Sequence, residues 1–160
     1  MKKRIAKRLT SAAIFAALFL FVPAIFEFTK EYTTKFFLEQ QPASEFFVYH
    51  KIEPVKRIYS FDEDLKFVSF NDVHKKLNFE WNDILRCDYD GQETGFVNIG
   101  SVQNRANGIE PHEGSSSTWN WDGPRPDGPA HCYLEANITA EVGYGVKKTQ
   151  RILSDDFRIE

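Results

Sequence analysis

The stretch that decides the fold runs from Cys132 to Val142 and reads CYLEANITAEV. Cys132, Leu134 and every second residue after them are apolar, whereas Tyr133 and the residues that alternate with them are mostly polar. Side chains of a strand alternate between its two faces, but those of a helix recur every 3.6 residues. The stretch therefore predicts a long antiparallel strand with one buried face and one face in water.

A second stretch, LNFEWNDILRC from Leu77 to Cys87, predicts another such strand. Its apolar face is interrupted by Asp83. Two explanations are open. A β-bulge near Asn82–Ile84 would turn the carboxyl group outward, and this is the one we favour. Otherwise Asp83 is a buried carboxylate that needs partners. The apolar face of the predicted strand consists of Leu77, Phe79, Trp81, Leu85 and Cys87.

Weaker strand patterns surround these two stretches, and turn-forming residues separate them. No stretch after residue 45 has a convincing helical period. Short strands spread over residues 45–160 favour a mostly β domain, which we expect to be an antiparallel two-sheet β-sandwich. The weaker strands are predicted at Phe46–Ile52, Leu65–Phe70, Phe96–Val102, Ser116–Trp121 and Val146–Leu153.

The N-terminal segment predicts a membrane anchor. Residues 1–8 contain five basic side chains, and residues 9–26 contain no charge. A membrane helix needs about 20 apolar residues, with a lower limit near 17. We predict a cytoplasmic leader at 1–8, a transmembrane signal anchor at 9–29 that contacts membrane lipid, a helical stalk or linker at 30–44 and an extracytoplasmic domain at 45–160.

A cleaved secretory signal peptide is the alternative, with its cleavage site after Ala24. The apolar run is long for a signal peptide, and Pro23 adjoins the cleavage site, so we favour the anchor. Both explanations place the C-terminal domain outside the cytoplasm, in the periplasm or the extracellular space.

Cys87 and Cys132 are the chain's two cysteines. Each lies on the apolar face of a predicted strand, one at its end and the other at its start. If these strands are antiparallel neighbours, the two thiols meet at the same edge of the core. An even number of cysteines in an exported protein favours a disulfide, so we predict a Cys87–Cys132 bridge.

The predicted domain resembles an immunoglobulin-like β-sandwich. The resemblance covers residues 45–160 and is carried by Trp81 on a middle strand, by Cys132 at the start of a late long strand, and by YSFDEDLKFVS at residues 59–69. The chain departs from the antibody pattern because its first cysteine follows the tryptophan, so that a bridge links different strands. The whole layout also resembles small single-pass membrane proteins of bacteria and their phages that have no assigned activity. A phage or mobile-element source would imply a role in modifying the cell envelope.

WNWDGPRPDGPAHC, residues 119–132, is the best candidate binding loop. Trp119 and Trp121 share a face if the chain is extended, and large aromatic side chains often anchor interfaces. Alternatively both rings fill the core and the following Pro/Gly segment is a stiff turn, which is the explanation we favour. The candidate loop residues are Trp119, Trp121, Asp122, Arg125 and Asp127.

No catalytic, metal or cofactor site is predicted. The four histidines lack metal-ligand spacing, and neither a nucleophile elbow nor a Gly-rich phosphate loop occurs. All 23 acidic side chains lie after residue 8, and an acidic domain of this kind disfavours nucleic-acid binding. We expect a non-enzymatic interaction or structural module that meets a protein partner at the envelope. The alternative is a small exported hydrolase or carbohydrate-active protein with its site in residues 119–131. The sequence specifies no oligomeric state.

Overall fold

The structure is a computed structural model. It describes the backbone of residues 2–90 and 95–160, and the side chains of residues 21–90 and 95–160. The chain divides into a helical unit, Met1–Gln40, and a β-rich unit, Gln41–Glu160. Each unit is described by itself.

The helical unit is one α-helix, α1 (Lys2–Gln40), which continues through Pro23. On its C-terminal half, the hydroxyl groups of Thr29 and Thr33 each donate a hydrogen bond of 2.7 Å to the carbonyl four residues earlier. The part of the helix whose side chains are described contains no segment with the length and apolarity needed to cross a membrane. Residues 9–20, which make up most of the predicted anchor, lie outside that part.

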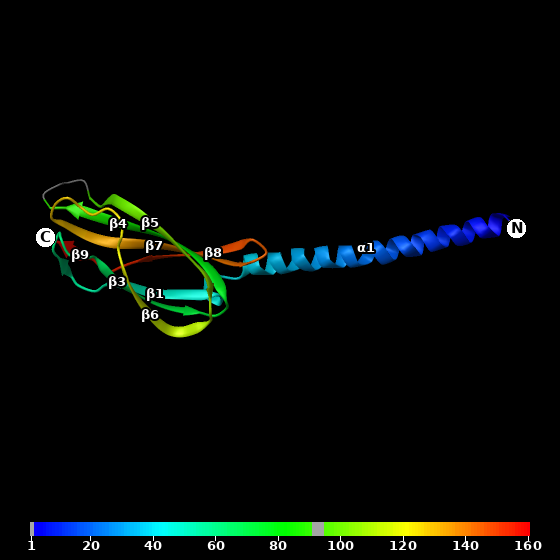
Figure 1. Ribbon diagram of the computed structural model, residues 1–160, viewed down its shortest axis with the longest axis horizontal. Coiled ribbons are helices and arrows are strands. Elements are labelled where there is room, and N and C mark those ends of the chain that lie inside the picture. Colours follow the sequence, from blue (N-terminus) through cyan, green and yellow to red (C-terminus); the bar gives the residue numbers. More distant parts are fainter. Residues whose placement is uncertain (1, 91–94) are drawn as a thin grey trace. The chain divides into compact units, whose positions relative to one another are not determined.

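The β-rich unit confirms the prediction of a mostly β domain with two sheets that face each other (Figure 1). It begins with a short 3-10 helix, η1 (Ala43–Glu45). The first sheet has the order β1 (Phe47–Pro54), β3 (Lys66–Val73), β6 (His112–Asn120). The second has the order β2 (Ile58–Tyr59), β9 (Phe157–Ile159), β7 (Ala130–Gly143), β4 (Leu77–Tyr89), β5 (Val97–Ile109), and β8 (Val146–Leu153) also pairs with β7.

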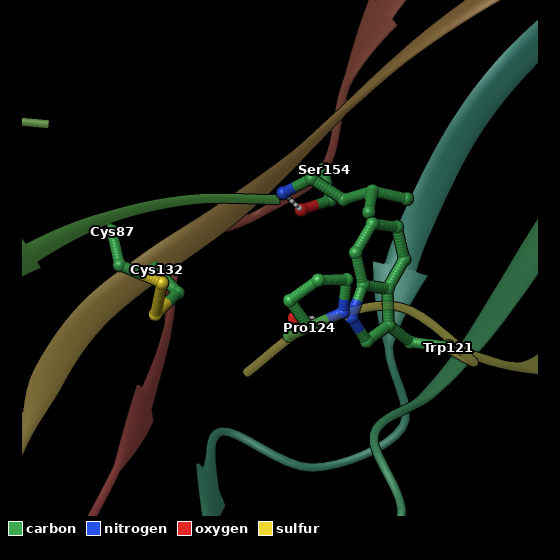
Figure 2. Close-up of a disulfide and its surroundings, with 6 residues drawn as sticks. Cys87, Trp121, Pro124, Cys132 and Ser154 are labelled. Carbon is green, nitrogen blue, oxygen red and sulfur yellow. Dashed lines mark hydrogen bonds between the residues drawn. A yellow bond between two sulfur atoms is a disulfide. The ribbon is translucent and has the colours of Figure 1, made fainter. Parts of the chain in front are cut away.

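Strands β4 and β7 form the centre of the second sheet. They pair antiparallel without a register shift from Asn78 to Tyr89, and Cys87 lies directly opposite Cys132. The two cysteines are fully buried, form a disulfide and have Cα atoms 4.1 Å apart (Figure 2). The predicted bridge is therefore present, and it joins two strands that are also hydrogen-bonded neighbours.

Asp83 lies inside the sandwich, so the predicted bulge near Asn82–Ile84 is wrong. β4 is paired on both sides, with Asp83 opposite Ala136 on β7 and opposite Val102 on β5. A bulge there would disrupt two ladders at once, and the β4–β5 ladder instead shifts register between Leu85 and Arg86. The regular alternation of β4 is kept, and it turns the carboxyl group inward, where only 5% of Asp83 is exposed.

Three other details differ from the sequence-based prediction. β5 is longer than the predicted strand Phe96–Val102: it continues through Asn107–Gly108, a dipeptide typical of turns, and ends at Ile109. The register shift between Leu77 and Phe79 accommodates Gly108 at a φ of 66°, a conformation that glycine adopts without steric cost. The short strands β2 and β9 were not predicted, and their pairing is parallel, whereas an all-antiparallel domain was expected.

Aromatic side chains join the two sheets. Phe47 on β1 contacts Phe79 on β4, with ring centroids 5.2 Å apart, and Phe67 on β3 contacts Phe157 on β9 at 5.5 Å. At the edge formed by β1 and β8, the amide of Gln150 accepts a hydrogen bond from Tyr49 N and donates one to Tyr49 O. This amide links the two sheets at that edge.

Candidate functional site

Polar side chains point into one part of the sandwich where apolar ones would be expected. Phe67 and Ser69 on β3 lie opposite Trp119 and Ser117 on β6, so each pair shares a face. Phe67 is fully buried and Ser69 is 5% exposed, which places that face inside. The two serine hydroxyls are 2.9 Å apart. Because serine is small, this part of the interior is not filled.

The unfilled space is a cavity of about 470 Å³ between the two sheets, which we term the inter-sheet cleft. Its volume lies in the range of about 300–1,000 Å³ that is common for small-molecule sites. The first sheet contributes Ile52 and the two serines to the lining, and the second sheet contributes Asn104 from β5. Both β5 and β6 are terminal strands of their sheets. The cleft is lined by Tyr49, Ile52, Ser69, Trp81, Asp83, Asn104, Ser117, Trp119, Asn120 and Asp122.

Three aromatic side chains form the walls of the inter-sheet cleft. The indole of Trp81 stacks on Phe79 with ring centroids 5.6 Å apart, and the indole of Trp119 stacks on Phe67 at 5.1 Å. Each indole therefore has one face covered and offers the other face or an edge to the cleft. The Trp81 Nε1–H donates a 3.1 Å hydrogen bond to the Tyr49 hydroxyl, which fixes both rings. Burial raises the pKa of Tyr49 to about 12, so that its hydroxyl stays protonated.

Asp83 is the charged group buried in the wall of the inter-sheet cleft. Within the described part of the chain, its Oδ1 atom is buried and has no hydrogen-bond partner. Burial disfavours the ionised form and raises the pKa of the Asp83 carboxyl to about 6. At neutral pH the cleft therefore contains a largely ionised carboxylate whose charge the surrounding side chains leave uncompensated.

The residues of the candidate loop at 119–131 lie in three different surroundings. Trp119 and the exposed Asp122 line the inter-sheet cleft. Trp121 is 3% exposed, and its Nε1–H donates to the Pro124 carbonyl at 2.9 Å (Figure 2). Arg125 donates to the Glu63 carbonyl at 2.6 Å, and Asp127 lies beside Tyr89. The expectation that both indoles fill the core thus describes Trp121 but not the half-buried Trp119.

Gly123 allows the segment after Trp121 to pack closely over that indole. A Cβ atom at position 123 would lie 2.4 Å from Trp121 Cζ2 and 2.8 Å from Val102 Cγ2. We expect Gly123→Ala to lower the free energy of unfolding by about 2 kcal/mol through overpacking. Urea unfolding followed by tryptophan fluorescence measures this, and Gly128→Ala, whose Cβ would come no closer than 3.8 Å to Tyr89, is the matched control. Equal stability of the two variants would contradict the packing described here.

The histidines do not form a metal site in the described part of the chain. No group of three or more potential ligands occurs there. His112 begins β6, and its Nε2 lies 2.6 Å from Asn71 Oδ1. His50 pairs with Asp72 at 2.7 Å. Both imidazole rings therefore interact with other side chains of the protein.

Sequence reasoning missed most of the site, because its residues come from different strands. Tyr49 is on β1, Trp81 and Asp83 are on β4, and Trp119 is on β6. Two signals were present in the sequence. One was a carboxylate on the apolar face of a predicted strand, and the other was a pair of serines at inward positions of two further strands.

Comparisons with known proteins add structural likeness alone. No family model matches this chain, and no curated protein matches it. A superoxide reductase (neelaredoxin) from Ignicoccus hospitalis is 14% identical, with a TM-score of 0.36 over 76% of this chain and 89% of that one. Spo0M, a sporulation control protein from Bacillus subtilis, is 14% identical, with a TM-score of 0.38 over 71% of this chain and 47% of that one. Likeness at this level does not indicate what the chain binds.

Proposed function

We propose that this protein is a non-catalytic interaction module, which residues 9–29 anchor in a membrane and whose β-sandwich binds its partner outside the cytoplasm. The observation that carries the proposal is the inter-sheet cleft. Its aromatic walls and its buried carboxylate provide apolar contact and one directional polar group. Binding sites typically combine these two elements.

The cost of building the cleft supports a binding role. A buried position occupied by leucine or valine would contribute about 1.5–3 kcal/mol of burial, which Ser69 gives up. Asp83 also carries a charge into an interior that disfavours it. A fold that only had to be stable would gain from filling this space, so the cleft is best explained by something that enters it.

The membrane anchor is part of the same proposal and rests on the sequence. The basic residues 1–8 precede 18 uncharged residues, and a leader of this kind stays in the cytoplasm while the rest of the chain is exported. The disulfide supports export, because such bridges persist in oxidising compartments. The immunoglobulin-like fold is also part of the proposal. It is supported by two mainly antiparallel sheets whose strands alternate along the chain, with β3 and β6 in one sheet and β4, β5 and β7 in the other.

A carbohydrate-active enzyme is the second candidate. It is favoured by the presence of two carboxylates, Asp83 and Asp122, in the same cleft as Trp119. Glycosidases use a pair of carboxyl groups, one of them with a raised pKa. Hydrolysis of an oligosaccharide that Asp83→Asn abolishes would establish this second candidate and would replace the proposal of a non-catalytic module.

Site-specific photo-crosslinking in cells of the source organism tests the proposal. A photoreactive phenylalanine analogue replaces Asn104, which is exposed, lines the cleft and lies opposite the lining residue Trp81. The control carries the same analogue at the exposed Thr118, whose neighbours Ser117 and Trp119 line the cleft, so that its side chain points to the other face of β6. We expect an adduct from position 104 in the membrane fraction and none from position 118.

Two results would contradict the proposal. One is the same adduct pattern from both positions, which would show that the cleft has no special role. The other is a mature protein that begins at Ile25, which would replace the anchor with a cleaved leader.

A further inference from the structure

We propose that the inter-sheet cleft binds a small organic ammonium cation, which lies against the indoles of Trp81 and Trp119 and pairs with the carboxylate of Asp83. This inference rests on the proposed function, because it names the chemical class of ligand for the same cleft.

Asp83 supplies the main argument. It is 5% exposed, it lines the cleft, and its Oδ1 atom has no hydrogen-bond partner in the described part of the chain. Buried carboxylates of folded proteins are normally paired or hydrogen-bonded. The inward direction of the Asp83 side chain is set by β4, whose ladder with β7 is regular from Asn78 to Tyr89. A cation in the cleft would provide the partner for the Asp83 carboxylate that the described side chains do not supply.

The aromatic walls suit the same ligand. A cation within about 6 Å of an indole face is attracted by the negative charge density of the ring, and the attraction is stronger when the site is desolvated. Trp81 and Trp119 come from opposite sheets, and each is backed by a phenylalanine. The Tyr49 hydroxyl accepts the Trp81 hydrogen bond, which orients its oxygen as a fixed acceptor beside the cleft.

The charges around the cleft exclude the opposite class of ligand. Among the described residues, the ten that line it include Asp83 and Asp122 but no lysine, arginine or histidine. A phosphate or carboxylate ligand would meet two acidic groups and no basic one. A neutral sugar would stack on the indoles but leave the charge of Asp83 uncompensated. The cation is the ligand that satisfies both the rings and the carboxylate.

The volume sets the size of the ligand. A cavity of about 470 Å³ is larger than a bare ammonium ion requires, so we expect an alkylated or otherwise extended ammonium group. A primary ammonium such as butylammonium can also donate a hydrogen bond to Asp83 Oδ1, whereas a quaternary ammonium depends on the ring faces and the counter-charge, so both types are tested.

Calorimetric titration of the full chain in phosphatidylglycerol nanodiscs tests the inference, because these lipids contain neither choline nor sugar. The probes are choline, its uncharged isostere 3,3-dimethyl-1-butanol, butylammonium and maltotriose. We expect at least one of the two cations to bind about tenfold or more tightly than the uncharged isostere, as expected for a desolvated cation–π and charge contact.

Variants locate the binding. Asp83→Asn and Trp119→Leu should each weaken binding of that cation by about tenfold. Asp62→Asn and Phe61→Leu, at exposed positions outside the cleft lining, should leave it unchanged. Thermal unfolding of each variant shows whether it is folded, and Trp119→Phe, which keeps a ring, should bind with intermediate affinity.

The outcomes separate this inference from the proposed function. If neither cation binds more tightly than the isostere, or if Asp83→Asn binds the cation as well as the unmodified chain does, the cation inference is wrong. Binding of maltotriose alone would overturn it in favour of a sugar while leaving the cleft as a binding site. Failure of the proposed function would appear instead in the crosslinking experiment, as the loss of any difference between positions 104 and 118.

Discussion

Replacing both cysteines, Cys87→Ala with Cys132→Ala, should lower the free energy of unfolding of the β-rich unit by about 4 kcal/mol. The bridge closes a loop of 45 residues in the unfolded chain, and the chain-entropy model assigns about this value to such a loop. Both side chains are also fully buried, so the loss of two sulfur atoms adds a smaller packing cost. A domain of this size has a total stability of about 5–15 kcal/mol, so a large part of it depends on the bridge.

Urea unfolding of the full chain in nanodiscs measures this effect. Adding a reductant should destabilise the unmodified protein by a similar amount and leave the double variant unchanged, which separates the bridge from the substitutions. The loop-closure explanation is wrong if the double variant loses less than about 1 kcal/mol.

Asp83→Asn should stabilise the protein at pH 7–8 by an amount of order 3 kcal/mol, and the gain should vanish near pH 4. Burial raises the pKa of Asp83 from its usual 3.8 to about 6 in the folded state. A raised pKa means that the folded state holds the proton more tightly, so stability is full below pH 4 and falls as pH rises through 6. A shift of about two pKa units corresponds to about 3 kcal/mol. The asparagine variant cannot ionise and avoids this loss.

Urea midpoints at several pH values test this expectation. Asp122→Asn removes an exposed carboxylate from the same cleft and should change stability by less than about 0.5 kcal/mol at any of them. Parallel stability curves for Asp83→Asn and the unmodified chain would show that Asp83 is not a buried charge. A gain in stability on losing a side chain is also the usual signature of a position kept for function rather than for folding.

The central strands and the disulfide were predictable from local pattern. CYLEANITAEV alternates over its whole length, and the stretch that ends at Cys87 alternates except at Asp83 and Ile84. The faces of the two strands and the position of the bridge follow from this period of two residues. The end of β5 was not predictable in this way. Asn107-Gly108 is a strong turn signal, but a register shift in the ladder absorbs it and the chain turns after Ile109.

The site was less predictable than the fold, and Asp83 shows why. From the sequence alone, an inward carboxylate is costly, and a bulge that turns it outward is the simpler explanation. The decisive fact was that β4 is paired on both sides, which is a property of the whole sheet. In the same way, Trp119 and Trp121 are indistinguishable by spacing. They differ because the segment after Trp121 folds back over that ring, whereas Trp119 lines the cleft and is half-buried.

Direct titration of the Asp83 carboxyl group tests the central claim, that the inter-sheet cleft is a binding site organised around this residue. Carbon-13 NMR of aspartate-labelled full chain, with the Asp83 signal assigned by its absence from Asp83→Asn, gives the pKa of Asp83 without ligand and with a saturating concentration of whichever cation, choline or butylammonium, binds more tightly. We predict a pKa near 6 in the free protein and a lower pKa with this cation, because a bound cation favours the ionised form. A pKa near 4 in the free protein that the cation does not move would contradict the account.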